Sequence, residues 1–208
     1  IDQTVQLSMF ISVPCAVGLA VLAQPIVSLL FGGTNGTAGK LLMLGSFTIL
    51  LNGMSNISNG VLQGIGRPKI PMITAAVALV VDVVAVVLLL LFTDLGIYSL
   101  LVAMIIYAVV VCILNDRAMK KYLRYKNPWR FAYLNPILAS IPMGAVAGLV
   151  YYGLYKLIQS NVICLCLSIA LGGATYFIVY ILMEKPSRER LRRMPGGAVL
   201  VKIFGRMF

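Results

Sequence analysis

The amino-acid sequence predicts an all-α membrane protein, a polytopic bundle of about six transmembrane helices. Of its 208 residues, 61% are hydrophobic and only 11% are charged, whereas about 25% are charged in a typical soluble domain. The mean hydropathy is +0.98. So few charged side chains cannot cover the surface of a soluble protein, and the apolar runs reach the length of about 20 residues that a bilayer requires.

The first three apolar stretches are separated by short segments of glycine and polar residues. Residues 6–31 end at the small polar loop 32–37. Residues 41–62 are followed by a turn that combines glycines with basic residues, and residues 70–92 end at a Thr-Asp-Leu-Gly turn. Each stretch is expected to form one helix, because such residues are common where helices end.

The other three stretches are bounded mainly by basic segments. Residues 97–114 lead into the basic segment 115–131, residues 132–157 turn at Gln-Ser-Asn, and residues 162–183 precede a basic tail. None of the stretches shows the alternation of apolar and polar residues that marks the strands of a membrane barrel. Residues 1–183 are therefore predicted to form the helix bundle, and residues 184–208 a basic cytoplasmic tail.

The positions of the basic residues predict the orientation in the membrane. All but two of the 17 lysines and arginines, namely Lys40 and Lys156, fall on one side of the predicted bundle. Because cytoplasmic loops retain basic residues, both ends of the chain are predicted to be cytoplasmic. Topology and anionic lipid account for the net charge of +11, so no nucleic-acid partner is expected. Contacts with membrane lipids are expected for Arg67, Lys69, Lys120, Lys121, Arg124, Arg192 and Arg193.

The residue types present argue against an enzyme. The sequence has no histidine, and no apolar stretch contains a pair of carboxylates, so the usual groups for proton transfer or metal binding are absent. Cys164 and Cys166 are two residues apart and point in different directions on a helix, which prevents them from sharing a metal. No catalytic residue, metal or cofactor is therefore expected.

Four amides on the second stretch form the most informative polar pattern. Their spacings of four, three and four residues place them on one face of a helix: Asn52, Asn56, Asn59 and Gln63. A buried amide needs a hydrogen-bond partner. The face is interpreted either as the wall of a hydrated cavity that binds sugar hydroxyls or phosphate, or as a set of contacts that hold neighbouring helices together.

Asp82 is the acidic residue that lies deep in an apolar stretch. A carboxylate at that depth is costly and usually faces a cavity or a cation. Asp82 is a candidate for binding a coupling proton or cation, or for pairing with a basic residue elsewhere in the protein. The alternative is a protonated, hydrogen-bonded carboxyl with a structural role.

Two strings of the sequence resemble a known family of exporters. They are ISVPCAVGLAVLAQPIVSLLFG at residues 11–32 and NGVLQGIGRPKIP at residues 59–71. Both are similar to the stage V sporulation protein B group, which belongs to polysaccharide biosynthesis and to the multidrug/oligosaccharidyl-lipid/polysaccharide exporter superfamily. A member of that group would not be expected to carry an acidic residue at Asp82.

The resemblance implies a fold and a function. Members have roughly fourteen helices in two lobes around a central cavity, and these six would be the carboxy-terminal part, without the amino-terminal lobe. The implied protein is a flippase of the bacterial cytoplasmic membrane that moves undecaprenyl-linked sugars or peptidoglycan precursors by alternating access. Two alternatives stay open: a drug/cation antiporter of the same superfamily, and a non-transporting membrane scaffold for envelope or spore assembly.

Overall fold

The computed structural model describes residues 2–32, 36–123 and 134–184, and within these ranges every regular element is a helix. The helices are α1 (Asp2–Val21), α2 (Ala23–Phe31), α3 (Gly36–Gly64), α4 (Lys69–Phe92), α5 (Ile97–Leu123), α6 (Asn135–Ile158) and α7 (Asn161–Glu184). By length and composition, α3 to α7 can each cross a membrane, and α1 with α2 forms a sixth candidate if the pair is one span. The predicted all-α membrane bundle is confirmed.

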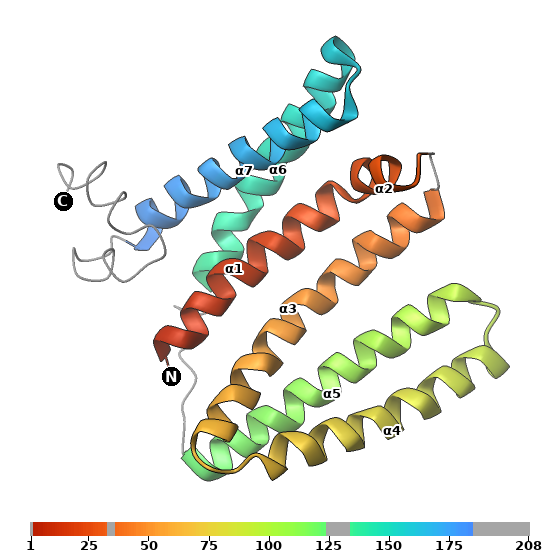
Figure 1. Ribbon diagram of the computed structural model, residues 1–208, viewed down its shortest axis with the longest axis vertical. Coiled ribbons are helices and arrows are strands. Elements are labelled where there is room, and N and C mark those ends of the chain that lie inside the picture. Colours follow the sequence, from red (N-terminus) through yellow and green to blue (C-terminus); the bar gives the residue numbers. More distant parts are fainter. Residues whose placement is uncertain (1, 33–35, 124–133, 185–208) are drawn as a thin grey trace.

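The long helices α4, α5, α3, α1 and α6 follow one another in one layer, and α7 pairs with α6 and crosses in front of it (Figure 1). The hairpins α4–α5 and α6–α7 flank a central pair formed by α1 and α3. Short α2 packs against α3 and α7. Many large apolar side chains point outward, and Val80 in the middle of α4 is 64% exposed. Such a surface suits helices that face lipid.

The stretch 6–31 is two helices rather than the single helix expected, and α1 and α2 meet at an angle of 70°. Proline lacks a backbone N–H, and its ring clashes with the carbonyl four residues earlier. For Pro25 that carbonyl belongs to Val21, which is the last residue of α1. Pro14 lies inside α1 without ending it. The position of Pro25 thus explains the break at Leu22.

Helix α5 continues beyond the expected end at residue 114 as far as Leu123. Its buried face also continues, through Ala108, Val111, Asn115 and Met119. These residues are three or four apart, which is the spacing of one helix face. The first residues of the expected basic loop 115–131 are therefore helical, whereas residues 124–131 lie outside the described residues.

The turn between α3 and α4 has a defined geometry. The N–H of Arg67 donates to the carbonyl of Leu62, and the N–H of Gly66 donates to that of Gln63, both at 3.0 Å. Gly66 has a φ of 75°, which glycine adopts without strain. This hydrogen-bond pattern is a Schellman motif, which satisfies the last carbonyls of a helix, and it fixes how α4 leaves α3.

Candidate functional site

The amide face of α3 is divided between paired and exposed side chains. Asn52 and Asn59 are half-buried, whereas Asn56 and Gln63 are exposed. The Oδ1 of Asn59 accepts a hydrogen bond of 2.7 Å from the Nδ2 of Asn115 in α5. Asn59 therefore holds two helices together, while Asn56 and Gln63 present amides on the surface of the described bundle.

Asn115 is the centre of a polar cluster that joins α3, α4 and α5. It is fully buried. Its Nδ2 makes the bond to Asn59, and its Oδ1 accepts a hydrogen bond of 2.9 Å from the Oγ1 of Thr74. The same Oγ1 lies 2.9 Å from the carbonyl oxygen of Pro71. The sequence reasoning missed Asn115 because it placed this residue in a loop. The spacing of Ala108, Val111, Asn115 and Met119 is the signal that identifies it as a core position.

A second contact between α3 and α5 lies further along the same helices. The Sγ of Cys112 donates to the carbonyl oxygen of Leu51 at 3.1 Å and lies 3.3 Å from the Oγ of Ser55. Ser55 is buried. Cys112 is half-buried and makes a polar contact between the two helices. Of the other cysteines, Cys164 is buried, whereas Cys15 and Cys166 are exposed.

Helix α1 approaches α3 closely next to the amide face. A Cβ atom added at Gly53 would contact the Oγ of Ser12 and lie 3.0 Å from the Cβ of Ser12. The Oγ of Ser8 lies 3.8 Å from the same position. Small side chains at helix interfaces permit such close contact. Two serine hydroxyls of α1 therefore lie beside the α3 face that carries Asn52 and Asn56.

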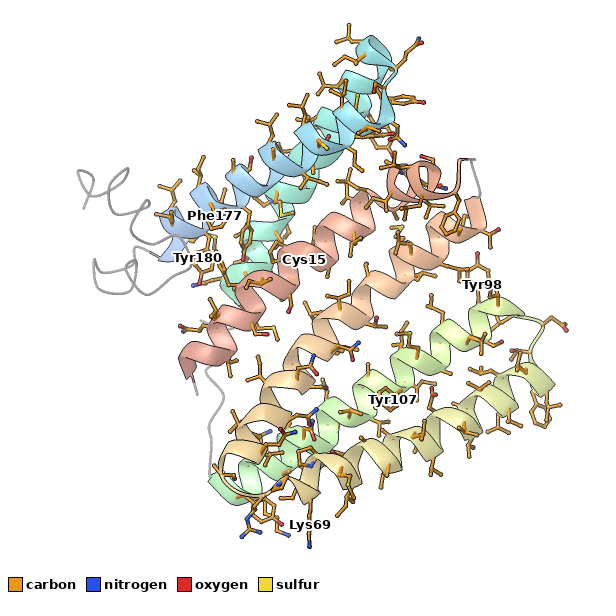
Figure 2. The ribbon with its side chains drawn as sticks, in the orientation of Figure 1. Cys15, Lys69, Tyr98, Tyr107, Phe177 and Tyr180 are labelled. Carbon is orange, nitrogen blue, oxygen red and sulfur yellow. The ribbon has the colours of Figure 1, made fainter. Side chains whose placement is uncertain are left out.

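Asp82 is half-buried on α4, and its Oδ1 is buried without a hydrogen-bond partner among the described residues. The bond between Thr74 and Asn115 sets the register of α4 against α5. Asp82 lies eight residues after Thr74, and Tyr107 lies eight residues before Asn115, so the two are about level on these antiparallel helices. Tyr107 is about midway between Lys69 and Tyr98 along the α4–α5 hairpin (Figure 2). A carboxylate oxygen at such depth attracts a proton, a cation or a hydrogen-bond donor.

Comparison with known proteins identifies the family. The family described as lipid II flippase MurJ matches residues 1–185. The chain belongs to the lipid II flippase family. The predicted membership of the exporter superfamily is thereby confirmed. No curated protein and no solved structure matches the chain.

The lipid II flippase family consists of membrane transporters rather than catalytic enzymes. The described residues contain no group of three or more histidine, cysteine or acidic side chains that could hold a metal ion. The polar side chains described above are mainly amides and hydroxyls. These groups bind polar ligands through hydrogen bonds and do not transfer protons readily.

Several basic side chains lie where α3, α4 and α5 meet. The guanidinium of Arg67 lies 4.4 Å from the ring centre of Tyr122, and the Nζ of Lys121 lies 5.5 Å from it. Lys120 forms a salt bridge of 2.6 Å with Asp116. Lys69 is exposed at the same end of the bundle (Figure 2). The other residues predicted to contact lipid, Arg124, Arg192 and Arg193, lie outside the described residues.

Proposed function

We propose that the chain forms part of a flippase that carries lipid-linked oligosaccharide or peptidoglycan precursors across the bacterial cytoplasmic membrane by alternating access. The observation that carries this proposal is the match of the lipid II flippase family to residues 1–185. The polar headgroup of such a precursor cannot cross hydrocarbon unaided. A transporter supplies a route lined with hydrogen-bonding groups between two lobes that open alternately.

On this proposal the amide face of α3 is part of the substrate route. Asn56 and Gln63 are exposed on the bundle, and amides in hydrocarbon are costly unless they meet protein or water. From Gln63 to Asn52 the face extends roughly 16 Å along the helix, beginning at the end of the bundle where Arg67 and Lys69 lie. A second lobe of helices, opposite this face, would complete a hydrated cavity.

Asp82 has a separate role in the proposal. Its buried Oδ1 lacks a partner among the described residues, so we assign it to a coupling proton or cation, or to a basic residue of the facing lobe. Replacing Asp82 by Asn keeps the shape and removes the charge. Where Asp82 binds the coupling proton or cation, Asp82→Asn is expected to abolish the dependence of flipping on the gradient of that proton or cation. The flipping of a fluorescent precursor in vesicles measures this dependence.

Thiol labelling of the complete protein tests the substrate route. Cys15, Cys112, Cys164 and Cys166 would first be replaced by alanine, and single cysteines placed at Asn52, Asn56, Asn59 and Gln63. We expect a membrane-impermeant thiol reagent to modify the exposed positions 56 and 63. Added lipid-linked precursor is expected to reduce that labelling several-fold, whereas position 59 reacts slowly because it lies between α3 and α5.

Phe47 supplies the matched control, because it is exposed on α3 but turned away from the amide face. A cysteine there should face lipid and stay unlabelled. Protection of position 56 by an organic cation instead of the precursor would favour a drug antiporter. Absence of labelling at both position 56 and position 63 in folded protein would contradict the route and favour a scaffold.

A further inference from the structure

Helix α1 by itself is about as long as a membrane span. Helix α1 contains 20 residues, which at about 1.5 Å per residue matches a hydrocarbon core of about 30 Å. Helix α2 leaves it at an angle of 70° and lies across the end of the bundle beside α7 and the start of α3 (Figure 1). With α1 near the bilayer normal, α2 lies close to the bilayer plane.

The polar side chains of α2 point toward the other helices. Gln24 packs so closely on α3 that a Cβ at Gly39 would lie 2.5 Å from its side chain. The Nδ2 of Asn161, at the start of α7, donates to the Oγ of Ser28 at 2.9 Å and to the carbonyl oxygen of Pro25 at 3.0 Å. Protein groups thus bind Ser28 and the Pro25 carbonyl, whereas Gln24 contacts α3 but remains exposed.

Asn161 is itself held in place. Its Oδ1 accepts a hydrogen bond of 2.9 Å from the hydroxyl of Tyr151 in α6. Tyr151 is buried and packs with Leu22, which lies at the bend between α1 and α2. One amide therefore connects α2, α6 and α7, and it fixes the angle at which α2 leaves α1.

The last turn of α2 points apolar side chains away from the bundle. Leu29 is exposed, and Leu30 and Phe31 are 70% and 71% exposed. Neighbouring large apolar side chains that point away from the protein in this way are expected in lipid rather than in water. Large apolar side chains are also exposed along the first half of α3, at Met43 and Phe47.

We propose that α2 is an interfacial helix that binds the bilayer leaflet at the Lys40 and Lys156 end, with Leu29, Leu30 and Phe31 inserted among the acyl chains. Both lysines are exposed, and their long side chains reach lipid phosphates while their stems stay in apolar surroundings. Gly32 ends the helix with a φ of 66°, so the chain turns away after the inserted residues. This assignment is independent of what the protein transports.

Nitroxide spin labels measure the depth of α2 in vesicles. The complete cysteine-free protein would be reconstituted in phosphatidylethanolamine and phosphatidylglycerol, with single labels at Leu29, Leu30 or Phe31. Collision with oxygen and with a water-soluble nickel complex gives the depth. All three labels are expected about 5–10 Å below the phosphates. Labels at Asp94, exposed in the turn between α4 and α5, and at Val80 supply the aqueous and mid-membrane references.

Three outcomes would overturn the assignment. Labels as deep as the one at Val80 would make α2 part of a broken span. Labels as accessible to nickel as the one at Asp94 would place α2 in water. Immobile labels that meet neither oxygen nor nickel would mean that another part of the protein covers the helix.

Substitutions at Asn161 and Tyr151 test whether the hydrogen bonds from Asn161 hold α2 in place. The measured quantity is the mobility of a spin label on α2 rather than its depth. Asn161→Asp keeps an acceptor for Tyr151 but loses both donations to α2. It is expected to increase the mobility of a label at Leu30 at least two-fold. Tyr151→Phe removes a bond that does not involve α2 and is expected to change that mobility much less. Equal effects of the two substitutions would contradict a specific role of Asn161.

Discussion

The two halves of the layer have similar arrangements but different contacts. In one half, the α4–α5 hairpin packs on α3, and a chain of hydrogen bonds through Thr74, Asn115 and Asn59 links the three helices. In the other half, the α6–α7 hairpin packs on α1, mainly through aromatic rings and glycines. A helix hairpin against a central helix is therefore stabilised in two physically different ways within one chain.

The α6–α7 hairpin packs on α1 mainly through the shapes of aromatic rings and through close approach at glycines. The ring of Phe10 lies 5.2 Å from that of Tyr176 and 4.7 Å from that of Tyr180, and Phe177 and Tyr180 lie near the same end of α7 (Figure 2). A Cβ at Gly144 would lie 2.9 Å from Val17. Ring and glycine contacts tolerate small shifts better than hydrogen bonds between buried amides do. We therefore expect α3, α4 and α5 to be the more tightly defined group.

The largest effect is expected from removing the central amide. Asn115→Ala leaves the Oδ1 of half-buried Asn59 without its donor and creates a cavity at the fully buried site of Asn115. We expect a loss of about 3 kcal/mol in the free energy of unfolding. Reversible unfolding by dodecyl sulfate in mixed micelles measures this loss. Asn56→Ala, at an exposed amide of α3, is the control and should change stability by less than about 0.5 kcal/mol.

A double variant sharpens the same comparison. Removing both partners of a hydrogen bond costs less than the two single losses combined, because no polar atom is left unpaired. Asn59→Ala with Asn115→Ala should therefore be more stable than the single variants predict by simple addition. Strict additivity would show that the amides do not act as a pair.

A smaller loss is expected when the close approach of α6 to α1 is disturbed. Gly144→Ala brings a Cβ to within 2.9 Å of Val17, whose branched side chain has little freedom in a helix. We expect a net loss of about 1–2 kcal/mol. Gly153→Ala, on the same helix but with no atom within 4 Å of the new Cβ, should be neutral or stabilising by up to about 1 kcal/mol. The same unfolding assay compares the two.

Tyr176→Phe tests whether a hydrogen bond adds to the aromatic packing. The hydroxyl of Tyr176 donates to the carbonyl oxygen of Phe10 at 2.9 Å in a buried position, and the substitution leaves the ring in place. We expect a loss of about 1 kcal/mol. Tyr152→Phe changes an exposed hydroxyl on α6 and should have little effect. Equal losses would show that the bond between Tyr176 and Phe10 contributes nothing specific.

The smallest effect is expected at the exposed end of α5. The salt bridge between Lys120 and Asp116 joins two exposed side chains four residues apart on α5. Surface pairs of this kind are weak and are screened by salt. Lys120→Gln should lower stability by less than about 0.5 kcal/mol at low salt, with no measurable change at high salt. A larger, salt-independent loss would indicate a contact beyond this pair.

The candidate site was only partly predictable from sequence. Helical spacing placed four amides on one face of α3, but it did not show that Asn59 is bonded to α5 while Asn56 and Gln63 are exposed. The partner of Asn59 is 56 residues away in sequence. A contact over that separation depends on how helices pack, which the pattern within one helix does not contain.

The sequence by itself determined that the chain is a bundle of long apolar helices. Long apolar runs with few charges indicate membrane spans, and the lack of alternation between apolar and polar residues argues against the strands of a barrel. Its strings at residues 11–32 and 59–71 also indicated the superfamily. Only the tertiary structure decided which polar groups meet. The cluster around Asn115 and the hydrogen bonds from Asn161 to α2 both depend on contacts between helices. Apolar runs do not specify such contacts, because many packings bury the same apolar surface while few satisfy each buried polar atom.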